Sequence, residues 1–506
     1  MVSVFNFGGQ YAHLIARRVR DLGVKSELVD PNIKLENLKK LKPDALILSG
    51  SPFSVYAKNS PKINTKIYEL KIPILGICYG QQLMANQLGG KVVGHESKQF
   101  GKEIVNIKKS PLFKNLASKQ TVWFSHGDRV EKLPKDFEII ASTRSVKIAG
   151  IQNLKKKFFA IQFHPEVTHT PNGMKILENF LFSISRAHKD WNLIKVKNQI
   201  VQSLKIKIKT GKVIMAISGG VDSLVASVLL NEAIGKNLYP VFIDTGLLRK
   251  GEVLEVQKIV SSLGFKNFKT ISSAKRFLKI LKGITDPEEK RKAIAKLYFK
   301  IFEEEAKKIG KVKFLGQGTI YPDRIESAQP TKHADKIKSH HNVTLPSGLK
   351  LDLVEPLAEF YKDEVRKIGK ILGINQIFLN RHPFPGPALA IRILGGISEE
   401  KLSILREVDD IFIKELKLSG LYNKVGQAFA ALLPIKAVGV MGDARTYSYI
   451  VSLRSVDTTD FMTADWTKIP YDLLGKISSR IVNEVRGVNR VVYDITQKPP
   501  ATIEYE

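Results

Sequence analysis

The chain contains a single cysteine, Cys78, within the string Gly76-Ile77-Cys78-Tyr79-Gly80. An apolar run at residues 72–77 predicts a β-strand before it, and a helix-like pattern follows at residues 81–88. A thiol at a helix N-terminus lies in a positive partial field beside free backbone N–H groups, which favours the thiolate. The position suits a nucleophile, but a lone cysteine is more often a buried small hydrophobic residue, and two further features decide between the two.

A base and a carboxylate are spaced to serve this nucleophile. Residues 158–166 form a predicted strand in which His164 and Glu166 lie two apart, and therefore on one side of an extended chain. A cysteine that attacks an acyl carbon needs a histidine to take and return its proton, and the histidine needs an acceptor that fixes its tautomer. A further predicted strand leads into a small-residue turn at Gly50, whose N–H could form an oxyanion hole with the N–H of Tyr79.

Together these segments resemble the class I glutamine amidotransferases, in which a Cys-His-Glu triad hydrolyses glutamine to glutamate and ammonia. The resemblance covers about the first 190 residues. It implies that Cys78, His164 and Glu166 are catalytic.

A second chemical centre follows an apolar predicted strand at residues 213–217 and precedes a predicted helix at 224–234. A glycine turn between a strand and a helix N-terminus is an anion cradle, because its backbone can approach phosphate oxygens closely. The Lys-Ser/Thr pair of a Walker-type loop is absent from this sequence, which argues against simple γ-phosphoryl transfer. The turn consists of Ser218, Gly219, Gly220, Val221, Asp222 and Ser223.

This string resembles the PP-loop of the N-type ATP pyrophosphatases, which hold the pyrophosphate of ATP and adenylylate a carbonyl oxygen. Further strands predicted at residues 238–246, 268–271 and 312–316, separated by helical patterns, indicate an open parallel sheet. Ligands bind such sheets at the carboxyl ends of the strands, where Asp244 and Gly318 would join the loop.

Three side chains near this loop have candidate roles in holding ATP. Lys362 is a candidate pyrophosphate ligand. Asp222 and Asp244 are candidate Mg²⁺ ligands, although either could equally be a helix cap or a turn residue.

The C-terminal third completes the resemblance to one family, the glutamine-hydrolysing GMP synthetases, which convert xanthosine 5′-monophosphate to GMP. The match runs in order along essentially the whole chain, with Ala388 where the family commonly has Gly. It implies glutamine, xanthosine 5′-monophosphate and ATP as substrates, with Mg²⁺. The strings that carry it are residues 338–343, 381–387, 425–430, 440–447 and 498–506.

The same resemblance implies a nucleotide site, since the phosphate dianion of xanthylate must meet cations. Arg490 and Lys498 are expected near the phosphate, and Arg291 is expected to reach in from the ATP domain, although a solvated helix face is its alternative. Gln427 and the Ile503-Glu504 pair are expected to close around the nucleotide.

These observations predict an α/β chain with two doubly wound, mainly parallel-sheet domains and a smaller α+β C-terminal domain. The expected boundaries are 1–190 for the amidotransferase, 191–385 for the ATP pyrophosphatase and 386–506 for a dimerisation and nucleotide-binding domain. Apolar strand edges in the last domain, together with the family resemblance, predict a homodimer.

Composition limits the remaining possibilities. A hydrophobic share of 43% in 506 residues predicts globular domains, and one cysteine fits a reducing compartment, with the cytoplasm as the expected location. We expect neither a leader nor a membrane span. The net charge of +31 is spread along the chain, so no specific nucleic-acid partner is expected.

Two alternatives stay open. One is another PP-loop enzyme, either an amidoligase that makes asparagine or NAD or a tRNA-modifying adenylase. The other is a non-catalytic, basic RNA-binding protein, although no binding module needs an intact Cys78, His164, Glu166 and PP-loop together.

Overall fold

The computed structural model describes the chain except for residues 10, 324–350, 385, 442, 459–463 and 499. The string at residues 338–343 therefore lies outside the described residues. The chain forms two compact units, Met1–Asn192 and Leu193–Glu506. A boundary at residue 385 within the second unit remains a prediction.

The first unit is built on one sheet of nine described strands, in the order β2-β1-β3-β4-β9-β8-β7-β5-β6. The first five in this order are parallel: β2 (Ser26–Val29), β1 (Val2–Phe5), β3 (Ala45–Leu48), β4 (Ile74–Ile77) and β9 (Phe158–Ile161). The other four are antiparallel: β8 (Gly150–Asn153), β7 (Glu138–Ser142), β5 (Lys91–Ile107) and β6 (Lys119–Lys132).

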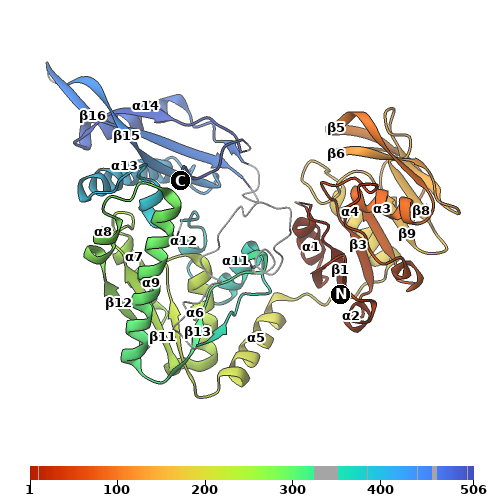
Figure 1. The fold of residues 1–506 in the computed structure, drawn as a ribbon, viewed down its shortest axis with the longest axis horizontal. Coiled ribbons are helices and arrows are strands. Elements are labelled where there is room, and N and C mark those ends of the chain that lie inside the picture. Colours follow the sequence, from red (N-terminus) through yellow and green to blue (C-terminus); the bar gives the residue numbers. More distant parts are fainter. Residues whose placement is uncertain (10, 324–350, 385, 442, 459–463, 499) are drawn as a thin grey trace. The chain divides into compact units, whose positions relative to one another are not determined.

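The parallel part holds the hydrophobic core of this unit. Every residue of β1, β3, β4 and β9 is buried, as expected for parallel strands covered on both faces. Figure 1 shows the helices beside these strands and the long β5–β6 pair extending from them. The α-helices are α1 (Ala12–Asp21), α2 (Leu35–Leu41), α3 (Tyr79–Gln87) and α4 (Gly173–Glu178), with the short 3-10 helices η1 (Thr65–Glu69) and η2 (Pro111–Phe113) and the π-helix η3 (Asn179–Ile184).

The second unit begins with a parallel sheet of five described strands, in the order β12-β11-β10-β13-β14. Helices α5, α6 and α11 pack against one another, and α8 packs against α9 (Figure 1). The strands are β10 (Lys212–Ala216), β11 (Leu238–Asp244), β12 (Lys269–Ser272), β13 (Val312–Gly316) and β14 (Asp352–Val354). The helices are α5 (Leu193–Ile208), α6 (Val221–Ile234), α7 (Glu252–Ser262), α8 (Ala274–Leu281), α9 (Pro287–Ile309), α11 (Lys362–Ile371) and α12 (Gln376–Leu379), with η4 (Gly235–Asn237).

A smaller sheet completes this unit. Strands β15 (Gln427–Met441) and β16 (Ala444–Asp457) form a long antiparallel pair, and β16 also pairs with β17 (Asp465–Trp466) and, in parallel, with β18 (Val488–Tyr493). Helix α13 (Glu399–Leu418) packs on β15, and α14 (Tyr471–Glu484) packs on α13 and β18. The short helix η5 (Ala388–Ile391) precedes them and begins at Ala388, whose φ of 56° is in the left-handed region.

The fold is therefore the predicted α/β class, with large parallel-rich sheets and a separate smaller C-terminal sheet. Among the described helices, none combines the length and the apolar character that a membrane crossing requires.

Candidate active sites

Three adjacent parallel strands of the first unit, β3, β4 and β9, lead directly into the three predicted catalytic segments. Gly50 follows β3, Cys78 follows β4 and His164 follows β9. Because the carboxyl ends of parallel strands meet at one edge of a sheet, segments about 30 and 85 residues apart in sequence converge there.

The turn at Cys78 is sharp. Cys78 has φ 56° and ψ −108° and stands immediately before α3, a strained backbone that projects its side chain from the strand-to-helix corner. A Cβ on Gly76 would lie 2.7 Å from the Gly80 carbonyl carbon, and one on Gly80 would lie 2.2 Å from Leu48 O. Glycine at both positions therefore lets α3 begin directly against β3 and β4.

His164 and Glu166 are in direct contact. The imidazole Nδ1–H donates to Glu166 Oε1 at 2.7 Å, and both side chains are buried. The predicted strand through residue 166 is wrong, because β9 ends at Ile161 and the contact is made within the following turn. After β9, Gln162 N–H donates to Ala149 O at 2.9 Å and His164 N–H donates to Trp123 O at 3.0 Å, which fixes the backbone of this turn. Arg18 of α1 donates from Nε to Glu166 O at 2.9 Å and helps hold this turn.

The charges around His164 suit an imidazole that exchanges a proton with the Cys78 thiol. Burial would lower the pKa of this imidazole, but the carboxylate of Glu166 and the negative charge of a Cys78 thiolate outweigh burial and raise its pKa to about 10. Its other ring nitrogen, Nε2, is buried and makes no hydrogen bond to a described residue. Nε2 is therefore available for proton exchange with Cys78.

Gly50 and Tyr79, whose N–H groups are the predicted oxyanion donors, lie beside Cys78. A Cβ on Gly50 would lie 3.4 Å from His164 Cε1 and 3.9 Å from Cys78 Cβ, so the backbone at Gly50 adjoins both side chains. The Tyr79 hydroxyl donates to Pro61 O at 2.6 Å. Tyr79 is the first residue of α3, where a backbone N–H has no partner within the helix.

In the second unit, the loop after β10 is organised by its two serines. The Ser223 hydroxyl lies 3.1 Å from the Ser218 hydroxyl, accepts from Ser218 N–H at 3.2 Å and donates to Gly220 O at 3.0 Å. Gly219 has φ 81°, and Gly220 caps α6, which begins at Val221. These contacts fold the loop over the N-terminus of α6, as an anion cradle requires.

Lys362 and Gly318 join this loop. The Lys362 ammonium pairs with Asp222 Oδ2, although the two residues are 140 positions apart, while Asp222 Oδ1 is buried and makes no hydrogen bond to a described residue. A Cβ on Gly318 would lie 2.9 Å from Ser223 N, so Gly318 packs directly against the first turn of α6.

Asp244 ends the neighbouring strand β11, and its Oδ1 accepts from Gly246 N–H at 2.9 Å. The described residues contain no group of three or more His, Cys, Asp or Glu side chains suited to a metal ion. Asp222 retains an unpaired carboxylate oxygen, which suits Mg²⁺ because Mg²⁺ in nucleotide sites uses one or two carboxylates together with phosphate oxygens and water.

Arg381 contacts the loop of residues 218–223, and the sequence did not predict this contact. Its Nη1 donates to Gly219 O at 3.4 Å, and its guanidinium pairs with Glu255 of α7. The string at residues 381–387 carries the family resemblance, but no local periodicity connects it to the loop.

His382, the next residue, contacts the smaller sheet. Its Nε2–H donates to Tyr422 O at 2.7 Å, its Nδ1 accepts from Ala428 N–H at 3.3 Å, and its ring stacks on Tyr422 with 3.9 Å between centroids. Burial lowers the pKa of His382 to about 4, outweighing the Tyr422 hydrogen bond, and the positive charge of Arg249 adds to the lowering.

We expect His382 to make the free energy of unfolding depend on pH in the acidic range. Because its folded pKa lies below the unfolded value, its stabilisation is complete above about pH 6.5 and is lost as the pH falls toward about 4, a loss on the order of 3 kcal/mol. His382→Gln keeps a donor and an acceptor but cannot titrate. Unfolding midpoints of both proteins between pH 8 and pH 4.5 should therefore converge in acid, and parallel curves would contradict the prediction.

The C-terminal segment, defined here as residues 498–506, lies against the smaller sheet. Gln427 Nε2 donates to Glu504 Oε1 at 2.7 Å, and Glu504 receives two hydrogen bonds from the fully buried Arg392, at 3.0 and 2.8 Å. Ile503 is buried in a cluster with Phe429 and other apolar residues.

The three predicted cations occupy different positions. Lys498 pairs through its backbone with Ala464, at 2.8 and 3.1 Å. Arg490 is exposed on β18. Arg291 is half-buried on α9, with its Nη1 at 3.7 Å from Glu288 Oε2. A hydrogen bond therefore joins Gln427 and Glu504 directly, while the grouping of Lys498, Arg490 and Arg291 around a phosphate stays a prediction.

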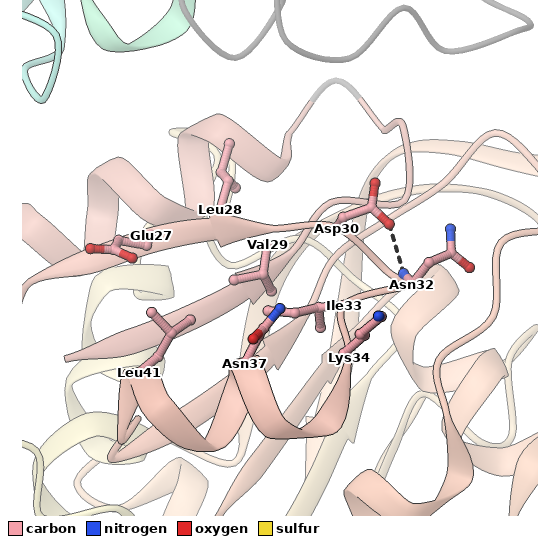
Figure 2. A pocket seen from close by; sticks show the side chains of 9 residues that line it. All are labelled: Glu27, Leu28, Val29, Asp30, Asn32, Ile33, Lys34, Asn37 and Leu41. Carbon is pink, nitrogen blue, oxygen red and sulfur yellow. Dashed lines mark hydrogen bonds between the residues drawn. The ribbon is translucent and has the colours of Figure 1, made fainter.

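A surface pocket of about 510 Å³ lies between β2 and α2 (Figure 2). None of the predicted site residues lines it, and Figure 2 shows its walls formed by side chains such as Val29, Ile33 and Leu41.

Comparison with known proteins decides the family. Residues 3–184 match the family model described as glutamine amidotransferase class-I, and residues 414–505 match the one described as GMP synthase C terminal domain. The chain is 51% identical to the glutamine-hydrolysing GMP synthases of Fusobacterium nucleatum and Aquifex aeolicus, with 100% of this chain and 99% of each relative covered. The chain belongs to the glutamine-hydrolysing GMP synthases.

The GMP synthase of Thermosipho melanesiensis is similar at 50% identity and the same coverage. Membership in this family makes the chain a ligase that uses glutamine as its amide donor, as predicted, and implies that it uses ATP. The alternative of a non-catalytic RNA-binding protein is thereby set aside.

Proposed function

We propose that this GMP synthase couples two reactions in separate units of one chain. Glutamine hydrolysis releases ammonia, ATP adenylylates the C2 oxygen of xanthosine 5′-monophosphate with release of pyrophosphate, and ammonia displaces AMP to give GMP. The observation that carries the proposal is the presence, in one chain, of a thiol at one sheet edge and an anion cradle at another.

In the first reaction, Cys78 attacks the glutamine amide carbon while His164 takes the thiol proton and returns it to the departing ammonia. Glu166 fixes the imidazole tautomer through the 2.7 Å hydrogen bond at Nδ1. The N–H groups of Gly50 and Tyr79 stabilise the oxyanion, and water then releases glutamate.

In the second reaction, the loop from Ser218 to Ser223 holds the pyrophosphate of ATP at the N-terminus of α6, and Lys362 neutralises its charge. Asp222 and Asp244 would hold Mg²⁺, which supplies charge neutralisation of the phosphates when bound. Gly318 keeps the first turn of α6 close to β13.

The acceptor nucleotide lies at the smaller sheet. Lys498, Arg490 and Arg291 provide positive charge for its phosphate, and Gln427, Ile503 and Glu504 contact the rest of the nucleotide. The support for this placement is the direct hydrogen bond between Gln427 and Glu504 and the burial of Ile503 beside them.

Product analysis tests the reaction as a whole. With xanthylate, ATP, Mg²⁺ and glutamine, we expect GMP, AMP and pyrophosphate in equal amounts, and no AMP when xanthylate is omitted. AMP formation with aspartate or with the deamidated precursor of NAD, but not with xanthylate, would favour another PP-loop amidoligase.

Lys498→Met tests the phosphate contact. Loss of one charge-assisted hydrogen bond typically weakens binding by roughly tenfold to a hundredfold, so the KM for xanthylate should rise by that factor while ATP affinity stays nearly unchanged. Deletion of residues 498–506 should have at least the same effect. An unchanged KM for xanthylate in an assembled variant would rule out this role.

We also propose that the enzyme is a homodimer formed through residues 386–506 and works in the cytoplasm, where a single unpaired cysteine is kept reduced. Light scattering on the unchanged chain and on Lys498→Met measures the assembly. It also keeps a loss of dimer from being mistaken for a loss of nucleotide binding.

A further inference from the structure

Lys290 of α9 is a fully buried cation. Its ammonium donates to Ile393 O at 2.8 Å and to Ala390 O at 3.2 Å, and it forms an ion pair with the side chain of Glu506. The two ion-pair partners are 216 residues apart in sequence. The Glu506 side chain is itself only 8% exposed, and its Oε1 accepts from Gly395 N–H at 3.1 Å.

A buried ammonium is stable only where acceptors replace water. Burial lowers the pKa of Lys290, Glu506 opposes that shift, and the positive charges of Lys401 and Arg291 add to it. The Glu506 carboxylate therefore supplies the negative charge that this buried position needs.

The residues before Glu506 are fixed in the same way. Arg454 donates to Ile503 O at 2.8 Å and Thr502 O at 2.9 Å, and the Tyr505 hydroxyl lies 2.8 Å from the Ser452 hydroxyl. Glu504 pairs with Arg392, which follows η5, and Glu506 pairs with Lys290 of α9. Each of residues 502–506 is therefore held by α9, by the segment after η5 or by the smaller sheet. These contacts anchor residues 502–506 on the second unit through buried side chains.

We propose that the Lys290–Glu506 ion pair is a positioning latch, which holds Glu504 and Ile503 in place for xanthylate and ties them to α9, the helix that carries Arg291. The inference rests on the proposed nucleotide site. Lys290 and Glu506 touch neither nucleotide in this account, so they are positioning residues and not catalytic ones.

Four variants of the full-length enzyme test the latch: Glu506→Gln, Lys290→Met, the double variant, and Glu400→Gln as a control at an exposed carboxylate of α13. Glu506→Gln should raise the KM for xanthylate roughly tenfold, with the KM for ATP and the glutaminase rate unchanged. The double variant removes both buried charges, so its unfolding midpoint should recover relative to Lys290→Met or Glu506→Gln. Its KM for xanthylate should remain raised, because the latch is still missing.

The outcomes separate the latch from the nucleotide site. An unchanged KM for xanthylate in Glu506→Gln, with Lys498→Met still impaired, overturns the latch and leaves the site. An unchanged KM in both variants overturns the placement of the nucleotide. If the KM values for xanthylate and ATP rise together and recover together with the unfolding midpoint, the pair has only a structural role and the latch is rejected.

Discussion

Cys78→Ala is expected to abolish GMP synthesis from glutamine while synthesis from free ammonia stays near that of the unchanged chain. The nucleophile is lost, and loss of a triad nucleophile lowers turnover by roughly 10⁴-fold or more. The ammonia reaction should survive because Cys78 lies in Met1–Asn192 and the anion cradle in Leu193–Glu506. Initial rates of AMP formation with each nitrogen donor give the comparison.

Cys78→Ser is a closely matched control, since it keeps the size of the side chain but presents a hydroxyl that ionises far less readily. It should behave as Cys78→Ala does. Equal loss of activity with glutamine and with ammonia in either variant would refute the assignment of two separate sites.

Asp222→Ala is expected to suppress conversion of ATP to AMP with either nitrogen donor, by roughly 10²-fold. The change removes the partner of Lys362 and the unpaired oxygen Oδ1 at the loop, and each charge-assisted contact is worth a factor of ten or more. Free ammonia should not restore activity, because adenylylation precedes amination. Pyrophosphate release measures this step.

Glu232→Ala is the matched control, because Glu232 lies near the other end of α6 and pairs with Lys197 on the surface. It should leave pyrophosphate release unchanged. Normal pyrophosphate release in Asp222→Ala would instead reduce Asp222 to a residue that only stabilises the start of α6 and its pair with Lys362.

The elements around the proposed triad of Cys78, His164 and Glu166 were predictable in position but not in detail. A strand, a sharp turn and a helix around Cys78 follow from local patterns, and the structure has all three. The His164–Glu166 contact is present as well, but a turn after Ile161 makes it instead of an extended strand. The antiparallel strands β5 to β8 were not predicted, because their pairing depends on the rest of the sheet.

Long-range contacts explain most of what the sequence did not indicate. Arg381 on Gly219 and Lys290 on Glu506 join residues 162 and 216 positions apart, and no local period records such pairs. The C-terminal segment was expected to close around a nucleotide. Its last five residues are anchored on buried Arg392, Arg454 and Lys290, which need their carbonyl and carboxylate oxygens as acceptors, and the closure itself stays a prediction.

The left-handed backbone of Ala388 bears on how this position can change over evolutionary time. An alanine in this conformation is strained by roughly 1 kcal/mol relative to glycine. Glycine, however, gives the unfolded chain more freedom, which lowers stability by about 0.4–1 kcal/mol. At a positive φ the strain is the larger of the two effects, so alanine here is less stable than glycine by a fraction of a kcal/mol, a cost small enough for a stable fold to tolerate at this position.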